Sequence, residues 1–261
     1  MKLKYFFLTF ISFYLISCGD VNVFPVETDL KIGELYDENI LENNSKIVSE
    51  EKNKDLYASI NKMKEDILTS PQIKYKSNFV WKLKIMDDDS TVNAFCTPGG
   101  YIYVYTGLIK FLESEDQLAG VLGHEIAHAD LRHSTSQMTK SLGIKAILFF
   151  LGIDGGLFTD IAQNLAGLTF SRDHETQADK YSVLYLSSTQ YDPKGVKYFF
   201  EKMRKKEGEN ASIQFLSTHP NPENRMEMIE KYWNELDLDT SAPKKKDDYR
   251  HILKLVNQIK K

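Results

Sequence analysis

The pattern Gly123-His124-Glu125-Ile126-Ala127-His128 sets the expectations for the rest of this chain. Two imidazoles four residues apart on a helix lie one turn above each other on the same face, so both reach one metal ion. Glu125 faces the same cleft, where a carboxylate serves as general base in zinc-assisted hydrolysis. The acidic start and the helical apolar spacing of residues 115–122 predict that the motif lies on a buried helix.

Length and composition indicate one globular domain with appendages. The chain has 261 residues, 42% of them hydrophobic, which is enough to bury a core. Its formal net charge of -4 gives no reason to expect nucleic acid as a partner. The only two cysteines are Cys18 and Cys96, so a disulfide scaffold is excluded. We expect Cys96 to be a buried free thiol.

The N-terminus predicts export and lipidation. Residues 1–17 combine two early lysines with an apolar stretch too short to span a bilayer comfortably. Leu15-Ile16-Ser17-Cys18-Gly19 resembles a bacterial lipobox, in which Cys18 carries the lipid that holds the protein to a bilayer. An ordinary secretory signal or an uncleaved anchor is the alternative. Residues 18–48 are expected to be the lipidated Cys and a flexible tether with a reach of about 30 Å.

The middle of the chain predicts a helix, a small sheet and further helices. Apolar residues at helical spacing predict a helix over 56–67. Alternating side chains over 79–86 predict a half-buried strand. Two β-rich runs, 92–96 and 101–107, flank Pro98-Gly99-Gly100 and predict a hairpin. The expected fold class is α+β, mostly helical, with a small antiparallel sheet or hairpin beside the metal-binding helix.

Two positions after the motif compete for the role of third metal ligand. The metzincin pattern places its third His at the position of Ser134, so His133 is expected to be exposed or to cap the helix end. Glu175 and Asp179 share one face of a predicted helix, whereas His174 points elsewhere. One carboxylate can bind the metal while the other accepts the free ring N–H of a ligand His. This predicts a two-His, one-Glu site with an open position for water.

Two later segments leave the core less defined. Residues 141–170 are unusually apolar, although charges interrupt them before they reach the length of a membrane span. We expect a pair of core helices, with a hydrophobic flap over the cleft or a membrane contact as the alternative. Residues 239–261 are expected to form a polar C-terminal tail with one short amphipathic helix.

The chain resembles the zinc endopeptidases (gluzincins) that include the CAAX prenyl proteases, HtpX and the periplasmic lipoprotein peptidases. The matching blocks, in order, are Asn93-Ala94-Phe95 with 98–108, Gly123–His128, Arg172–Asp179, and Ser217–Pro220 with Arg225. The resemblance implies a zincin-type domain with one zinc ion per chain.

It also implies the role of each residue in the site. The zinc ligands would be His124, His128 and Glu175, with Glu125 as base and His219 near the substrate oxyanion; Asp179 keeps the place behind a ligand His that its spacing predicts. Asn93 and Ala94 would lie on an edge strand that pairs with the substrate backbone, and Arg225 would contact substrate.

The expected domain division is a signal peptide (1–17), the lipidated tether (18–48), a zinc metallopeptidase domain (49–238) and the tail (239–261). The expected function is a zinc-dependent endopeptidase that acts on unfolded or misassembled envelope proteins from the periplasmic face of the bacterial outer membrane. The alternative is a chaperone-like periplasmic lipoprotein that binds unfolded chains with little proteolysis. The intact ligand set and Glu125 argue against this alternative.

Overall fold

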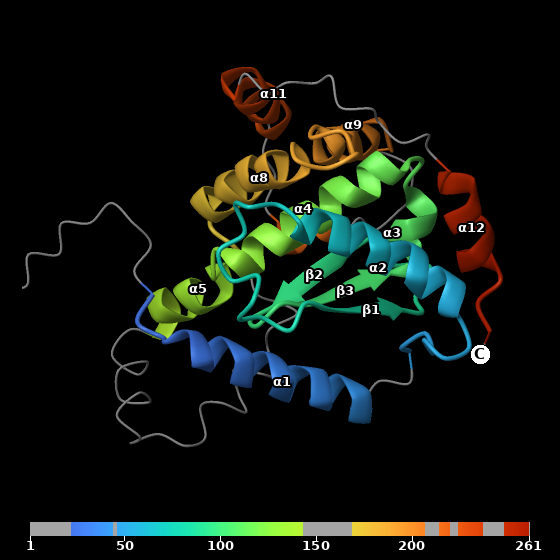
Figure 1. Ribbon diagram of the computed structural model, residues 1–261, viewed down its shortest axis with the longest axis horizontal. Coiled ribbons are helices and arrows are strands. Elements are labelled where there is room, and N and C mark those ends of the chain that lie inside the picture. Colours follow the sequence, from blue (N-terminus) through green and yellow to red (C-terminus); the bar gives the residue numbers. More distant parts are fainter. Residues whose placement is uncertain are drawn as a thin grey trace, which may run out of the picture.

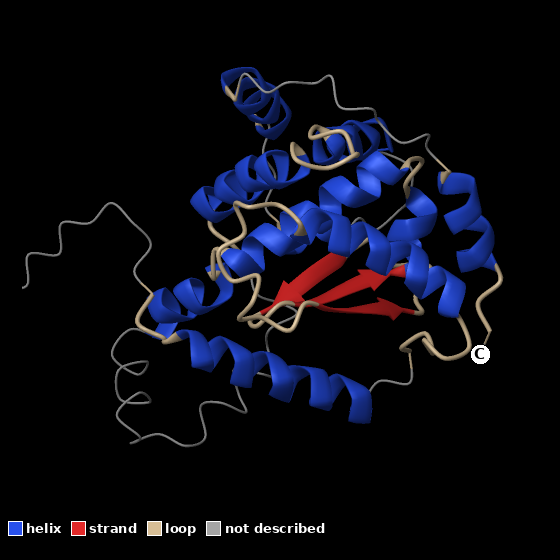
Figure 2. Ribbon diagram, in the orientation of Figure 1, coloured by secondary structure: helices blue, strands red, loops and turns tan. Residues whose placement is uncertain are grey.

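The computed structural model describes residues 22–43, 46–142, 169–206, 214–219, 224–236 and 248–260. In these ranges a three-stranded sheet lies between helices on both of its faces, which confirms the predicted helical α+β fold (Figure 1 and Figure 2). No helix in the described ranges is both long and apolar enough to cross a membrane. Most of the apolar segment 141–170 lies outside the described residues.

The elements follow one another along the chain as a helix pair, the sheet and then helices. They are α1 (Val26–Asn43), α2 (Lys54–Leu68), β1 (Lys82–Met86), β2 (Ala94–Thr97), β3 (Tyr101–Tyr105), α3 (Thr106–Phe111), α4 (Glu115–Asp130), α5 (His133–Leu142), α8 (Arg172–Leu186), α9 (Gly195–Lys206), α10 (Phe215–Thr218), α11 (Arg225–Glu235) and α12 (Tyr249–Asn257). The helix predicted over 56–67 is α2, and the helix predicted to carry the motif is α4.

The sheet has the order β1-β3-β2. Strands β2 and β3 are antiparallel, which confirms the hairpin around Pro98-Gly99-Gly100. Gly99 and Gly100 have φ of 80° and 88°, a backbone conformation that favours glycine. The prediction that the whole sheet is antiparallel is wrong, because β1 and β3 are parallel. After the hairpin turn, β3 runs in the same direction as β1 and lies between β1 and β2.

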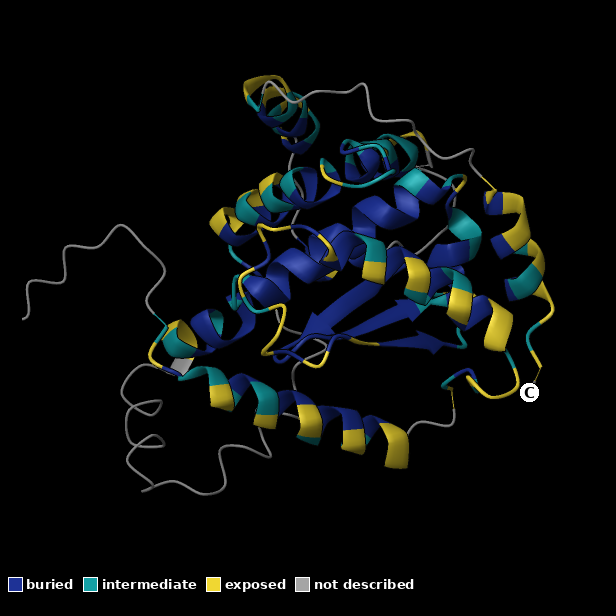
Figure 3. Cartoon of the chain, viewed as in Figure 1, coloured by how far each residue is buried: buried dark blue, intermediate teal, exposed yellow. Residues whose placement is uncertain are grey.

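Both faces of the sheet are buried (Figure 3). Leu83 and Ile85 of β1 face the larger core, together with α2 and α4. Lys84 and Met86 are also buried, on the opposite face. The predicted alternation holds at Val80 and Lys82, which are exposed. It is wrong at Lys84 and Met86, because α1 covers this part of the face that was expected to contact solvent (Figure 1).

The segment expected to be a flexible tether instead forms α1. Ile32, Tyr36 and Ile40 follow at four-residue spacing and are buried against the sheet. The ring of Tyr36 makes edge contacts with Phe95, at 6.1 Å, and with Tyr103, at 5.7 Å. The tether prediction is wrong for residues 26–43. The many charged residues between the apolar ones made the helical spacing of the apolar residues hard to recognise.

The expected C-terminal tail also belongs to the domain. Helix α12 buries Ile252 and Val256 in the larger core. The Tyr249 hydroxyl donates to the carbonyl of Ile109 at 2.6 Å, and the backbone of Lys260 exchanges two hydrogen bonds with the Asn53 side chain. The predicted amphipathic helix is confirmed. The prediction that it lies in a tail outside the domain is wrong.

Helix α4 lies at the centre of the fold, between the sheet and helices α8 and α9 (Figure 1). Its start is capped by the Ser114 side chain, which accepts from the Gln117 N–H at 3.2 Å. A Cβ added at Gly120 would lie 2.1 Å from the Val196 nitrogen, so glycine is needed for α9 to approach this closely. The motif helix is therefore buried on every side that the described residues cover.

We predict that Asp37→Asn weakens the docking of α1. The Asp37 carboxylate lies 2.5 Å from Lys84 Nζ and 3.0 Å from Lys82 Nζ, and the Tyr103 hydroxyl donates to it at 2.9 Å. The substitution leaves the buried Lys84 ammonium without a counter-charge, so the free energy of unfolding should fall by about 3 kcal/mol. Denaturant titration at neutral pH measures this. Glu38→Gln, an exposed change on the same helix, should stay within about 0.5 kcal/mol of wild type.

Acid should remove the difference between Asp37→Asn and wild type. Burial acts to raise the pKa of Asp37, but hydrogen bonds from Lys84, Lys82 and Tyr103 outweigh it and lower that pKa below its usual value. A carboxylate with a lower pKa in the folded state stabilises the fold above its unfolded pKa, about 3.9, and loses this contribution as pH falls through the folded value. An undiminished difference in acid would contradict this account.

Candidate metal centre

Three parts of the chain bring together four side chains that could hold a metal ion. His124 and His128 come from α4, Glu175 from α8, and His219 directly follows α10. One donor atom of each lies within 4.8 Å of all the others, and all four residues are buried. Helix α8 begins with Ser171, which caps it by accepting from the His174 N–H at 3.2 Å. The cap aligns the first turn of α8, and with it Glu175, toward α4.

The spacing of these donors fits one zinc ion. His124 Nε2 and His128 Nε2 are 3.0 Å apart, and the two Glu175 oxygens lie 3.5 Å from one or the other of these nitrogens. Ligand atoms at zinc bond lengths in a tetrahedron lie about 3.4 Å from one another. Two imidazoles and a carboxylate are also the donor types that zinc prefers. The predicted two-His, one-Glu set therefore meets at a single point.

His219 joins this group rather than lying only near a substrate. Its Nδ1 lies 3.3 Å from His124 Nε2 and 3.1 Å from Glu175 Oε1. Its Nε2 points the other way and lies 3.5 Å from Glu125 Oε1. The ring thus lies between the donor group and the predicted general base, a position that the His219-Pro220 pattern alone did not indicate.

Glu125 is buried beside the donor group. Neither of its carboxylate oxygens has a hydrogen-bond partner among the described residues. Burial raises the pKa of Glu125, an effect that the nearby His219 and His124 oppose. An unsatisfied buried carboxylate beside a metal site is suited to accept a proton from water.

Two of the three predicted ligands, His128 and Glu175, have the protonation that metal binding requires, whereas His124 does not. Burial holds the pKa of His128 well below its usual value, so the ring is neutral and keeps a lone pair. Burial acts to raise the pKa of Glu175, but His219, His124 and His128 hold it well below its usual value, so it is ionised. For His124, hydrogen bonds to Asp179 and Glu175 overcome burial and raise the pKa to about 9. A metal ion must displace that proton, which makes metal binding weaker in acid.

Asp179 lies behind His124, where the sequence predicted an acceptor. Its Oδ1 is 3.0 Å from His124 Nδ1. Arg225 was expected to contact substrate, but its side chain is buried and its guanidinium binds both Asp179 oxygens. It also lies 3.0 Å from Glu175 Oε2. Arg225 therefore orients the two carboxylates of the site, and its charge offsets theirs.

The predicted substrate strand lies at an edge of the sheet. Strand β2 pairs with β3 alone among the described strands. The Tyr105 N–H donates to the Asn93 carbonyl, so by the alternation of an antiparallel ladder the backbone groups of Ala94 and Cys96 face away from β3. The Asn93 side chain is buried, and its Oδ1 has no partner among the described residues. Cys96 is a buried free thiol, as predicted.

His133 was expected to be exposed or to cap the helix end, and this prediction is wrong. The residue is 1% exposed, and its Nδ1 lies 3.0 Å from Nδ1 of His128. His174, predicted not to be a ligand, lies outside the donor group and stacks on the His133 ring. No local pattern pointed to His133, because five residues after His128 is the wrong side of a continuous helix.

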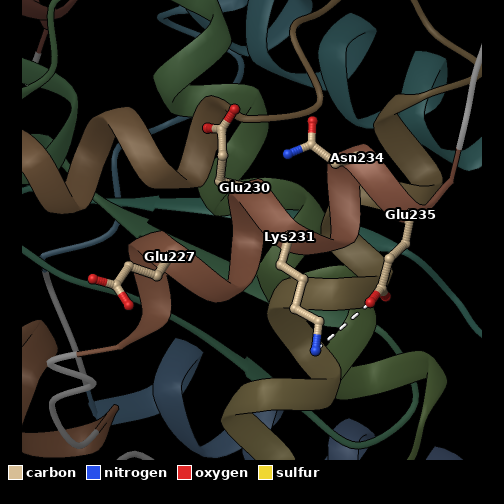
Figure 4. A pocket seen from close by; sticks show the side chains of 5 residues that line it. All are labelled: Glu227, Glu230, Lys231, Asn234 and Glu235. Carbon is tan, nitrogen blue, oxygen red and sulfur yellow. Dashed lines mark ion pairs between the residues drawn. The ribbon is translucent and has the colours of Figure 1, made fainter.

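A separate hollow of about 510 Å³ lies on α11 (Figure 4). Its lining side chains are Glu227, Glu230, Lys231, Asn234 and Glu235. They all come from one helix. Three of them form ion pairs: Lys231 with Glu235, at 3.7 Å, and Glu230 with Lys197, at 2.6 Å. None of them belongs to the donor group, so this surface is distinct from the metal centre.

The fold and the donor group together are those of a zinc metallopeptidase domain: an H-E-x-x-H helix, a buried Glu on a following helix within reach of both His, and an adjacent small sheet. Comparison with known families agrees. Residues 51–233 match the model of peptidase family M48, and the chain belongs to this family.

Several characterised proteins are similar to this region. The mitochondrial metalloendopeptidase OMA1 of Schizosaccharomyces pombe is 34% identical over 161 residues, 60% of this chain and 48% of that protein. Metalloprotease YcaL of Escherichia coli is 30% identical over 142 residues, 51% of this chain and 56% of that protein. The beta-barrel assembly-enhancing protease of Escherichia coli is 27% identical over 155 residues, 53% of this chain and 32% of that protein. The chain thus spans only about a third to a half of the length of these curated relatives.

We predict that the metal content of the purified protein depends on the three ligands. Wild type should hold close to one zinc per chain. His124→Ala and Glu175→Ala should release it, whereas Asp179→Asn should weaken binding by roughly ten- to a hundredfold. Zinc affinity of the wild type should also be lower at about pH 6 than at about pH 8, because protons compete for His124. Elemental analysis and chelator competition measure these effects.

His251→Ala is the matched control, because this His is exposed on α12. It should keep the full zinc content. Stoichiometric zinc in Glu175→Ala would show that Glu175 is not the third ligand.

Proposed function

We propose that this protein is a zinc-dependent endopeptidase of the bacterial cell envelope that hydrolyses peptide bonds in misfolded or misassembled envelope proteins. The observation that carries the proposal is the unsatisfied Glu125 carboxylate beside a buried donor group, next to the edge strand β2. The name of one Escherichia coli relative, the beta-barrel assembly-enhancing protease, supports an envelope role. The name of the other, metalloprotease YcaL, supports the chemistry alone. The similarity to mitochondrial OMA1 supports the chemistry without supporting the location.

The residues have distinct parts in this chemistry. His124, His128 and Glu175 hold the zinc, which when bound polarises a peptide carbonyl and makes a water molecule more acidic. Glu125 takes the proton of the attacking water and passes it to the leaving amine. His219, whose Nε2 faces Glu125 and has no hydrogen bond within the described residues, is placed to donate to the developing oxyanion.

We predict that Glu125→Gln abolishes proteolysis without releasing zinc. The amide keeps the shape of the side chain but cannot accept the proton, so cleavage of unfolded casein should fall by about a hundredfold or more. Glu113→Gln, an exposed change before α4, serves as control and should cleave normally. Chelator-insensitive cleavage, or full activity of Glu125→Gln, would favour the chaperone-like alternative with a contaminating protease.

Substrate binding by strand addition to β2 follows from the same geometry. An edge strand offers backbone donors and acceptors to any extended peptide and demands no particular sequence. Such a site selects unfolded segments, because folded strands and helices have already paired these groups. Ala94 is buried in this structure, and the Phe215 N–H donates to the Val92 carbonyl at 3.2 Å. A peptide paired along β2 would therefore lie next to the α10 segment, which contacts the residues just before the strand.

We predict that Ala94→Pro lowers kcat/KM for an unfolded substrate by about tenfold, the equivalent of one lost backbone hydrogen bond. Zinc content should stay normal, because the outward N–H of Ala94 takes no part in the β2–β3 ladder. Ala94→Gly retains the N–H and should keep most of the activity. Normal cleavage by a folded, zinc-loaded Ala94→Pro variant would rule out strand addition at this position.

A lipid on Cys18 would hold the domain close to the bilayer. The Asn22 side chain donates to the Thr135 hydroxyl at 2.8 Å, next to the end of α4. Only three residues separate Cys18 from Asn22, and an extended chain spans at most about 14 Å over that distance. The anchor thus favours substrates whose unfolded segments lie near the membrane surface. A tether with a reach of about 30 Å would also have allowed segments farther from the membrane.

We predict that Cys18→Ser prevents lipidation. The variant should incorporate no labelled fatty acid and should leave the membrane fraction, since the thiol is the acyl acceptor. Cys96→Ser is the matched control, because Cys96 is buried in the sheet, and it should be labelled normally. Persistent labelling of Cys18→Ser would exclude the lipobox interpretation.

A further inference from the structure

The two ligand histidines of α4 differ in what their second ring nitrogen contacts. For His124 this nitrogen, Nδ1, lies 3.0 Å from Asp179 Oδ1. For His128 it lies 3.0 Å from Nδ1 of His133. A His that binds a metal through one nitrogen keeps a proton on the other, and the acceptor of that proton fixes the ring. His133 Nδ1 lies where such an acceptor for His128 would be.

The fold has to bend the chain for this contact to form. In a continuous helix, residue i+5 lies about 140° around the axis from residue i, so His133 would face away from His128. Helix α4 instead ends at Asp130, and Arg132 has a φ of 58°, in the left-handed region. Helix α5 then starts at His133 and returns its ring toward His128.

Helix α1 and the residue Phe24 just before it hold this bend in place. Arg132 donates through Nε and Nη2 to Asp29 Oδ2, at 3.1 and 2.6 Å, and through Nη2 to the Phe24 carbonyl at 2.5 Å. A non-glycine residue in the left-handed region costs on the order of 1 kcal/mol, and such a residue persists where its surroundings fix it. The buried Asp29 carboxylate of α1 provides that constraint.

The His133 ring is also fixed from the side of α8. It stacks on His174 with ring centroids 4.4 Å apart and planes 14° from parallel. His174 directly precedes Glu175 on α8. His133 therefore contacts one ligand on α4 and the neighbour of another ligand on α8.

We propose that His133 is a positioning residue of the metal centre, whose Nδ1 lone pair accepts the Nδ1–H of His128 and directs His128 Nε2 toward the metal. His133 is then the neutral tautomer with its proton on Nε2. The two α4 ligands have unlike acceptors, a carboxylate for His124 and an imidazole for His128. The inference rests on zinc at the site and not on the proposed substrate or location.

Zinc affinity of three His133 variants tests this role. In the purified mature chain, His133→Leu removes the acceptor and should raise the zinc Kd by about ten- to a hundredfold. In His133→Asn the amide Oδ1 takes the place of Nδ1, and the Kd should stay within about threefold of wild type. His133→Gln moves the acceptor one bond further out and should bind as weakly as His133→Leu. His251→Leu, an exposed change on α12, should bind zinc normally.

Cobalt-loaded protein gives a readout that does not depend on activity. The wild type should show an exchangeable, paramagnetically shifted ring N–H resonance for His128, protected from solvent by its acceptor. In His133→Asn this resonance should persist at a changed shift, and in His133→Leu it should exchange faster. If His133→Leu does not fold, the zinc affinity of His133→Asn and the His128 N–H resonance of the wild type test the proposal instead.

Wild-type zinc affinity in a folded His133→Leu variant would overturn the proposal, as would a weak His133→Asn or a His128 resonance that His133→Asn leaves unshifted. Failure of the proposed function looks different. It would leave these affinities and resonances as expected while wild type failed to cleave unfolded protein.

Discussion

The structure depends on stabilising several buried charged side chains around the middle of helix α4. Helix α4 is covered by the sheet on one side and by α8 and α9 on the other. Glu125 on α4 and Glu175 and Asp179 on α8 are all buried. Three ionised carboxylates in a buried environment destabilise the folded state unless positively charged groups pair with them. The buried Arg225 guanidinium pairs with two of them, Glu175 and Asp179. A zinc ion bound at the group of His124, His128 and Glu175 would supply further positive charge.

This charge balance explains why the domain needs elements distant in the sequence. Arg225 comes from the start of α11 and His219 from the end of α10, so the C-terminal third of the domain completes a site begun on α4. The N-terminal α1 contributes at the opposite end. It covers the sheet through Asp37 and Lys84 and holds the bend after α4 through Asp29 and Arg132. A segment that looked like a linker is thus part of the scaffold of the metal centre.

The same arrangement connects the proposed chemistry to the proposed substrate. Strand β2 runs beside α4, so a chain paired along β2 would pass next to Glu125. The α10 segment contacts the start of this strand and carries His219 into the donor group. One segment therefore contacts both the strand that would bind a peptide and the residues that would cleave it. The chaperone-like alternative has no use for a base held in this position.

The sequence by itself determined the parts that depend on local spacing. Residues four apart share a helix face, so spacing alone pairs His124 with His128 and Glu175 with Asp179. Alternation and the Pro98-Gly99-Gly100 turn likewise predicted the β2–β3 hairpin. Only the tertiary structure decided the parts that depend on partners far along the chain. The Asp37–Lys84 ion pair helps to fix α1 on the sheet. The Arg225 side chain is buried because it forms an ion pair with Asp179. His133 contacts His128 because the ion pair between Asp29 and Arg132 stabilises the bend after α4. No pattern within one segment encodes these contacts, since each requires two distant segments to be packed together first.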